Sequence, residues 1–297
     1  MDLNECILCP RKCKVNRNNG EVGFCKAGNK IKIARYSLHM WEEPCISGEK
    51  GSGTIFFSCC NLKCIFCQNH NISINNNGKE ITIDKFVEIC LKLQEMGANN
   101  INLVTPTMYI PLIKEGLIIA KGKGLSIPIV YNSSGYESVE ALKELDGLID
   151  IYLPDFKYFD NKLAVDFSTA DNYCSIAKDA LKEMYRQVNK PIFKDDIMVK
   201  GMIVRHLLLP NHIDDSKKII EYLYDTYKDN IYLSILNQYT PVLKIEKFKE
   251  LNKTVSDDEY GELIDYACDL GISKAFIQEG ETCKESFIPD FNNYENI

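Results

Sequence analysis

Short apolar runs alternate with amphipathic stretches through most of this chain, and that alternation constrains the fold more than any other feature. The stretch 84–97 has helical spacing, because Phe86, Ile89, Leu93 and Met96 fall on one face. Similar spacing recurs at 138–147, 214–227 and 256–271. The apolar runs are GTIFFS (53–58), NINLVTPT (100–107), IPIVYNSS (127–134), LIDIYLPDF (148–156), MIVRHLLLP (202–210), IYLSILNQY (231–239) and KAFIQEG (274–280).

Strands that alternate with single helices form βαβ units, and such units build a parallel sheet. The residues alone leave a full or partial α/β barrel and an open doubly wound sheet as alternatives. No Gly-x-Gly-x-x-Gly follows the first apolar run, which lowers the case for a dinucleotide-binding fold.

Charge and hydropathy limit the partners and the compartment. The net charge of −7 and the pI of about 5.3 argue against binding to nucleic acid or an acidic membrane, since both require a basic face. The first residues lack a long apolar core, and no stretch approaches the roughly 18 apolar residues of a membrane span. We therefore expect a cytoplasmic protein. Thiols stay reduced there, so the 13 cysteines indicate metal or redox chemistry rather than disulfides.

Nine of the 13 cysteines fall within the first 67 residues. Residues 1–50 are polar and too few to build a core of their own, which predicts a small cysteine-rich, metal-binding lobe before an α/β domain at 51–297. Zinc, a second iron–sulfur cluster or no metal at all remain open for this lobe, and Cys45 could join or replace a ligand. The four candidate ligands are Cys6, Cys9, Cys13 and Cys25.

A second group of cysteines, Cys60-x-x-x-Cys64-x-x-Cys67, directly follows the first apolar run. The carboxyl ends of parallel strands form the active face of α/β folds. Three thiolates on so short a loop can wrap one corner of a [4Fe–4S] cubane and leave one iron without a protein ligand. Structural zinc, with Cys59 or His70 as a fourth ligand, and a reactive thiol pair are the alternatives.

Cys-x-x-x-Cys-x-aromatic-Cys after the first strand of such a barrel resembles the radical S-adenosylmethionine (SAM) superfamily. Further segments are similar to its pyruvate formate-lyase-activating-enzyme-like branch, and together they run over nearly the whole chain. They are CILCPRKCKVNRNNGEVGFC, EEPCISGEKGSGTIFFS, CQN, NLVTPTMYIP, LPDFKY, VRHLLLPN, LNQYTP and FIPDF. The chain departs from the branch in having Cys59 where Gly is expected and Met108 where His is expected.

The resemblance implies a partial TIM-type (β/α)6 barrel with a small N-terminal cysteine-rich lobe. It also implies an enzyme whose [4Fe–4S] cluster has one open iron that chelates SAM. An electron from a low-potential donor of the flavodoxin or ferredoxin type then releases a 5′-deoxyadenosyl radical, which abstracts hydrogen from a substrate. One version installs a glycyl radical on a partner protein, and another modifies or rearranges a different protein or small molecule. A non-catalytic zinc-binding scaffold is the alternative from another class.

By the same resemblance, Phe66 lies against the adenine of SAM, and Thr105 stands in the segment that contacts its amino group. Strand alternation places Asp155 and Lys157 on the same side of their strand. Together with Arg205 they suit the hydroxyl and carboxylate groups of SAM, because a charge on an apolar strand requires a partner.

Four further residues carry weaker expectations. His206 faces away from Arg205, toward the core or the surface. Gln238 and Tyr239 are placed on the substrate side. Cys90 and Cys268, which lie in helical patterns, are expected to be small buried side chains. A structural ion pair remains the alternative for Asp155 and Lys157.

Overall fold

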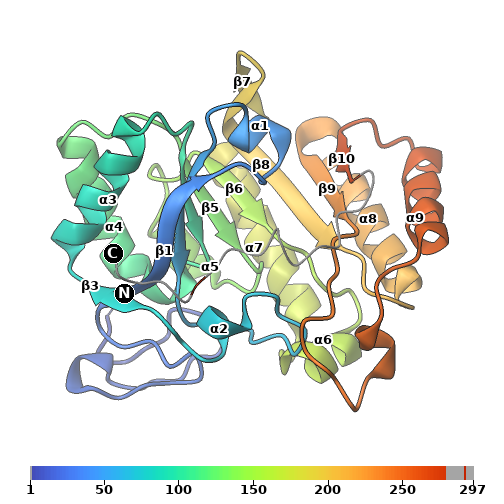
Figure 1. The fold of residues 1–297 in the computed structure, drawn as a ribbon, viewed down its shortest axis with the longest axis horizontal. Coiled ribbons are helices and arrows are strands. Elements are labelled where there is room, and N and C mark those ends of the chain that lie inside the picture. Colours follow the sequence, from blue (N-terminus) through green and yellow to red (C-terminus); the bar gives the residue numbers. More distant parts are fainter. Residues whose placement is uncertain (1, 279–290, 292–297) are drawn as a thin grey trace.

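The computed structural model describes residues 2–278 and residue 291, and its centre is a curved parallel sheet (Figure 1). Each of the seven predicted apolar runs forms a strand. The sheet runs in the order β10-β9-β8-β6-β5-β4-β2-β1-β3, and neighbouring strands from β2 to β10 are parallel. The expected partial α/β barrel is therefore confirmed. Its strands are β2 (Ser52–Phe57), β4 (Ile101–Val104), β5 (Ile129–Ser133), β6 (Ile151–Pro154), β8 (Ile197–Leu207), β9 (Tyr232–Leu236) and β10 (Ala275–Ile277).

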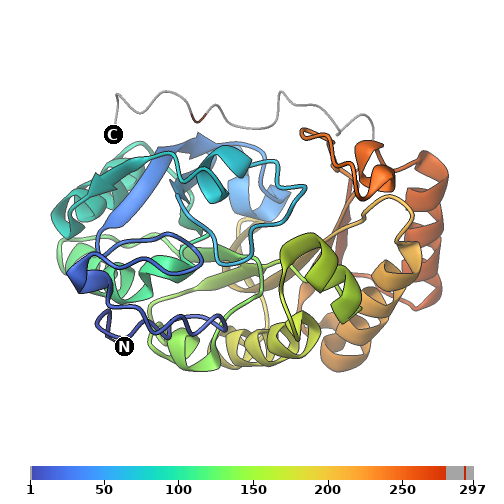
Figure 2. The same ribbon diagram turned by 90° about the horizontal axis from the view of Figure 1, so that it is seen from below.

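Helices flank the outside of the barrel, as the two views show (Figures 1 and 2). Within the described residues, no helix is long and apolar enough to cross a membrane. The longer helices are α3 (Ile83–Glu95), α4 (Ile110–Gly122), α6 (Asn161–Ser168), α7 (Tyr173–Val188), α8 (Ile213–Tyr227) and α9 (Asp257–Asp269). Shorter helical segments are α5 (Val139–Lys143), α2 (His70–Ser73), η2 (Thr107–Tyr109), η3 (Lys228–Asn230) and η4 (Lys249–Asn252).

Two exposure predictions on the helices were wrong. Met96 was expected on the buried face of α3, but it is 49% exposed, because the helix ends at Glu95 and the chain turns outward at Gly97. Cys268 is exposed as well, since the inward face of α9 carries Leu263 and Ala267 and the next residue is rotated by about 100°. Cys90 is fully buried, as predicted.

Residues 31–50, which the sequence places in the lobe, form part of the barrel. The strand β1 (Ile31–His39) pairs antiparallel with β2 and with the short strand β3 (Lys79–Ile81). After it, the one-turn helix α1 (Pro44–Ser47) packs Cys45 and Ile46 into a buried cluster with residues of β5, β6 and β8. The segment 40–47 therefore closes the amino-terminal end of the barrel. The hairpin that β7 (Ile192–Lys194) forms with β8 lies at the same end (Figure 1).

Residues 2–30 form loops and one 3-10 turn, η1 (Arg17–Asn19), beside the carboxyl ends of the strands. Arg11 attaches these loops to the barrel. Its Nε donates to the carbonyl of Asn61 at 2.9 Å, and its Nη2 donates to the carbonyl of Ser168 at 3.1 Å. Its guanidinium also stacks 4.0 Å from the ring centroid of Phe24. The lobe thus contacts the loop that carries Cys60.

Candidate active site

A cavity of about 570 Å³ lies inside the barrel and extends to the carboxyl ends of the strands. The side chains that the sequence analysis assigned to the first cluster and to SAM all line it, and so do Gln238 and Tyr239. The eight assigned residues are Cys60, Cys64, Cys67, Phe66, Thr105, Asp155, Lys157 and Arg205. The fold thus brings residues that are up to 145 positions apart into one space.

Hydrogen bonds hold the three cysteine sulfurs on one wall of this cavity. The amide of Leu62 donates to Cys60 Sγ at 3.3 Å. The Ser168 hydroxyl donates to Cys64 Sγ at 3.0 Å, and the Ser73 hydroxyl donates to Cys67 Sγ at 3.3 Å. Donors aimed at sulfur stabilise the thiolate, which is the form that ligates iron.

Without a metal, the Cys60 thiol would be neutral, because burial and, to a smaller extent, the neighbouring Cys64 raise its pKa to about 12. An iron ion removes such protons outright, because a coordinated thiol ionises. Among the described residues, no three His, Cys, Asp or Glu side chains converge on a single-ion site.

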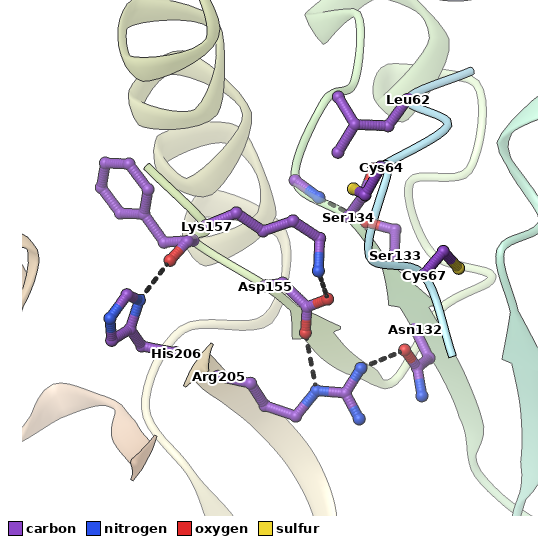
Figure 3. A network of polar contacts seen from close by, with 12 residues as sticks. Leu62, Cys64, Cys67, Asn132, Ser133, Ser134, Asp155, Lys157, Arg205 and His206 are labelled. Atoms are coloured by element: carbon purple, nitrogen blue, oxygen red, sulfur yellow. Dashed lines mark hydrogen bonds and ion pairs between the residues drawn. The ribbon is translucent and has the colours of Figure 1, made fainter. Parts of the chain in front are cut away.

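Opposite the cysteines, a largely buried ionic network joins β5, the carboxyl end of β6 and β8 (Figure 3), and it extends to Glu42 in the 40–47 segment. Lys157 Nζ and Arg205 Nε each donate to the Asp155 carboxylate, at 2.7 and 2.9 Å. Arg205 also donates to Asn132 Oδ1 at 2.7 Å and to Glu42 Oε2 at 3.3 Å. The predicted common side for Asp155 and Lys157 is confirmed.

Both members of the central pair remain charged. Burial acts to raise the pKa of Asp155, but Arg205 and Lys157 outweigh it and the pKa falls below its usual value. Burial likewise opposes the charge of Lys157, and Asp155 outweighs it, so the pKa of Lys157 rises. A lysine has three N–H donors, and one serves Asp155. Lys157 therefore keeps donors for a ligand in the cavity.

Glu42 is a site residue that the sequence analysis missed. It is 9% exposed, and its Oε1 accepts a hydrogen bond from Asn102 Nδ2 at 2.9 Å. Its neighbour Glu43 is buried as well, and Glu43 Oε2 has no hydrogen-bond partner within the described structure. No local pattern reveals these acids, because only the closure of the barrel end by residues 40–47 takes them inside.

Phe66 and Thr105 reach the cavity in different ways. Phe66 is 7% exposed and makes edge-to-face contacts with Phe167 and Tyr239, at centroid distances of 6.3 and 5.8 Å. Thr105 has a φ of +59°, a conformation that is costly for a β-branched residue. Its amide donates to the carbonyl of Asn132 at 2.8 Å. Strain of this kind is concentrated at functional sites.

His206 and Met108, which the sequence analysis also named, are both buried. His206 points away from the cavity into the core, as predicted, with its ring nitrogens 2.8 Å from the Phe156 carbonyl and the Ser216 hydroxyl (Figure 3). Met108 is buried, and its carbonyl accepts a hydrogen bond from Arg17.

Comparison with known proteins identifies the family. Residues 54–223 match the sequence profile of the Radical SAM superfamily. The chain is 32% identical over 278 residues to the uncharacterized protein MJ0674 of Methanocaldococcus jannaschii, covering 89% of this chain and 75% of the relative. A second protein of that organism, the uncharacterized protein MJ0808, is 25% identical over 240 residues, which cover 74% of this chain and 66% of the relative.

Solved structures share the fold at low sequence identity. Methylornithine synthase superposes with a TM-score of 0.51 at 16% identity, over 73% of this chain and 60% of that one. Streptococcus suis SuiB bound to precursor peptide SuiA superposes with a TM-score of 0.51 at 14% identity, over 75% of this chain and 47% of that one. The structure of anSMEcpe with AdoMet and a peptide superposes with a TM-score of 0.51 at 13% identity, over 73% of this chain and 60% of that one. The chain thus spans less than two thirds of each of these proteins.

The cysteine loop, the cavity and the profile match together define the class of protein. This chain belongs to the radical SAM superfamily, whose members are enzymes that use a [4Fe–4S] cluster and SAM.

Proposed function

We propose that this enzyme binds its cluster through Cys60, Cys64 and Cys67 and holds SAM across the same cavity. In this proposal it removes a hydrogen atom from a protein substrate. The observation that supports it is the single cavity that brings the three thiols together with the network of Asp155, Lys157 and Arg205.

Each cavity residue has a role that its surroundings suit. Lys157 binds the carboxylate of SAM, since it keeps unused N–H donors and interacts electrostatically with Cys64. Asp155 positions Lys157 and accepts from the ribose hydroxyls. Phe66 presents a ring edge or face to the adenine. When bound, the reduced cluster and SAM together supply an adenosyl radical capable of hydrogen abstraction.

A polypeptide is the substrate class that we favour. Two of the structural neighbours named above are described with a bound peptide. The sequence resemblance to activating enzymes supports the narrower version, in which the chain installs a glycyl radical on a partner protein. The electron in either version comes from a flavodoxin- or ferredoxin-type donor. Trp41, which lines the cavity and is 68% exposed, provides an aromatic contact at its rim.

Anaerobic reconstitution with iron and sulfide, followed by SAM and a chemical reductant, tests the proposal. We expect 5′-deoxyadenosine and methionine as products. Lys157→Met is expected to weaken SAM binding roughly 10- to 1000-fold in calorimetric titration, about 1.4 to 4 kcal/mol. The matched control is Lys217→Met, because Lys217 forms an exposed ion pair with Glu262 and does not line the cavity. Wild-type SAM affinity in Lys157→Met would make this lysine a structural residue.

The substrate class has its own readout. After SAM cleavage is established, incubation with a glycyl-radical protein is expected to produce a glycyl radical detectable by electron paramagnetic resonance. SAM cleavage without that radical would contradict the glycyl-radical version. Modification of an added peptide, found by mass spectrometry, would then support the broader one.

A further inference from the structure

Glu137 is a buried acid that lies outside the cavity and its ionic network. Its side chain is only 2% exposed. The carboxylate oxygens accept hydrogen bonds from the hydroxyls of Thr107, at 2.7 Å, and Tyr131, at 3.2 Å. No cation among the described residues pairs with this carboxyl group. Burying a carboxyl group without a cation is costly, and the two hydrogen bonds offset part of that cost while they fix both hydroxyls in place.

Thr107 belongs to a segment that reaches the cavity. Two positions before it, Thr105 lines the cavity with a φ of +59°, a conformation that is costly for a β-branched residue. Pro106 lies between the two threonines, and its ring restricts its own φ. The backbone between the hydrogen bond to Glu137 and the strained residue is therefore short and stiff, so that a shift of Thr107 also moves Thr105.

Two further contacts hold the rest of this segment. The Tyr109 hydroxyl donates to the carbonyl of Ser58 at 3.1 Å. Arg17, in the N-terminal lobe, donates to the carbonyl of Met108 at 2.7 Å. Of the side-chain contacts that hold the segment, the one with Glu137 lies nearest in sequence to the strained residue.

The loop 134–138, which carries this carboxyl group, is itself fixed to the active site. Asn61, in the cysteine loop, donates from its side chain to the carbonyl of Tyr136 at 2.8 Å. The Tyr173 hydroxyl donates to another carbonyl of the loop at 2.8 Å and accepts from the amide of Lys157 at 2.9 Å. A strained residue persists only where the surrounding structure holds it firmly, and a loop tied to both walls of the cavity provides such a support.

We infer that Glu137 is a positioning residue for SAM, because it acts through Thr107 to hold Thr105 in the left-handed conformation in which the cavity accepts SAM. The inference rests on the proposed function, since it requires that SAM binds in this cavity next to Thr105. Glu137 itself does not touch the ligand, because it does not line the cavity. Without its hydrogen bond, Thr105 relaxes to a more favourable backbone conformation and the binding geometry is lost.

Calorimetric titration of SAM into the anaerobically reconstituted full-length enzyme tests this inference. Glu137→Leu and Thr107→Val each remove one end of the hydrogen bond with little change in volume. Each is expected to weaken SAM binding about 10-fold, which corresponds to backbone strain of this kind. The matched controls Glu137→Gln and Thr107→Ser keep the hydrogen bond and are expected to bind SAM within about twofold of wild type. In turnover, the KM for SAM is expected to rise in the first pair while kcat stays unchanged.

The variant Thr105→Gly separates positioning from general structural support. Glycine adopts the left-handed conformation without steric cost. In this background, adding Glu137→Leu is therefore expected to change SAM affinity by no more than about twofold. A full loss of about 10-fold in that background would overturn the inference, and so would wild-type affinity in Glu137→Leu.

Iron content and melting temperature are measured for every variant before the titration. If Glu137→Leu does not fold, Thr107→Val alone and in the Thr105→Gly background decides by the same two criteria. A wild-type enzyme that binds no SAM would refute the proposed function. Normal SAM binding in the wild type with no effect of either substitution would refute only the role of Glu137.

Discussion

Replacing Arg205 by methionine is expected to destabilise the folded enzyme far more than the loss of one surface charge would. Its side chain is 17% exposed and contacts Asp155, Asn132 and Glu42 at 2.7 to 3.3 Å. Methionine keeps the apolar stem but leaves Glu42 without a cation. Breaking a buried ion pair by removing one partner costs about 3–5 kcal/mol. Lys157→Met is expected to cost less, since Asp155 then still pairs with Arg205.

The cost of Arg205→Met also depends on pH. Burial raises the pKa of Glu42 and Arg205 lowers it, so removal of the arginine raises that pKa further above its value in the unfolded chain. A carboxyl group whose pKa is higher in the folded chain than in the unfolded chain stabilises the fold at low pH, and the protein loses this stability as the pH rises through the folded-state pKa. The variant is therefore expected to be closer to wild type at lower pH than at higher pH, because a protonated Glu42 needs no cation.

Urea denaturation of the reconstituted proteins over a series of pH values measures these differences. Lys217→Met is the control, because it breaks a 2.6 Å ion pair on the surface, where such pairs contribute about 0–1 kcal/mol. If Arg205→Met loses no more free energy of unfolding than this control, the arginine is not the organising charge of the network.

Two further predictions concern the cluster and a buried acid. Cys64→Ala is expected to abolish the visible absorption of the first cluster and SAM cleavage, while Cys90→Ala retains both; cleavage retained in Cys64→Ala would contradict the ligand assignment. Burial raises the pKa of Glu137 to about 7, with smaller opposing contributions from Thr107 and Tyr131. The difference from the usual value of 4.5 corresponds to about 3 kcal/mol in the free energy of unfolding. This stabilisation is fully present below pH 4.5 and is lost as the pH rises through 7. Glu137→Gln is expected to remove this dependence between pH 5 and 8; identical denaturation profiles would refute it.

Local sequence patterns were sufficient to predict a parallel sheet of βαβ units and the position of the thiol loop, whereas the choice of a partial barrel came from the resemblance to the radical SAM superfamily. Strand periodicity placed Asp155 and Lys157 on one side, and the position of the Cys60 loop after the first strand placed it at the carboxyl ends. These inferences hold because a strand alternates its side chains and a parallel sheet gathers its strand ends at one edge. Neither property depends on contacts distant in the sequence.

Short-range patterns were weaker where burial depends on distant partners. The strand β1 and the one-turn helix α1 went unpredicted, although β1 joins the sheet and α1 closes the barrel end. Met96 and Cys268 were assigned to buried faces, but the end of one helix and the rotation of the other place them at the surface.

The sequence by itself determined the class of fold, the thiol loop and three of the charges in the cavity. Only the tertiary structure decided that Glu42 shares Arg205 with Asp155, and that Arg17 donates to the carbonyl of Met108. The physical reason is that a buried charge must find its partner in space. Glu42 and Arg205 are 163 positions apart, and Arg17 and Met108 are 91 apart. The sequence periodicity of a single helix or strand cannot predict such a long-range pairing.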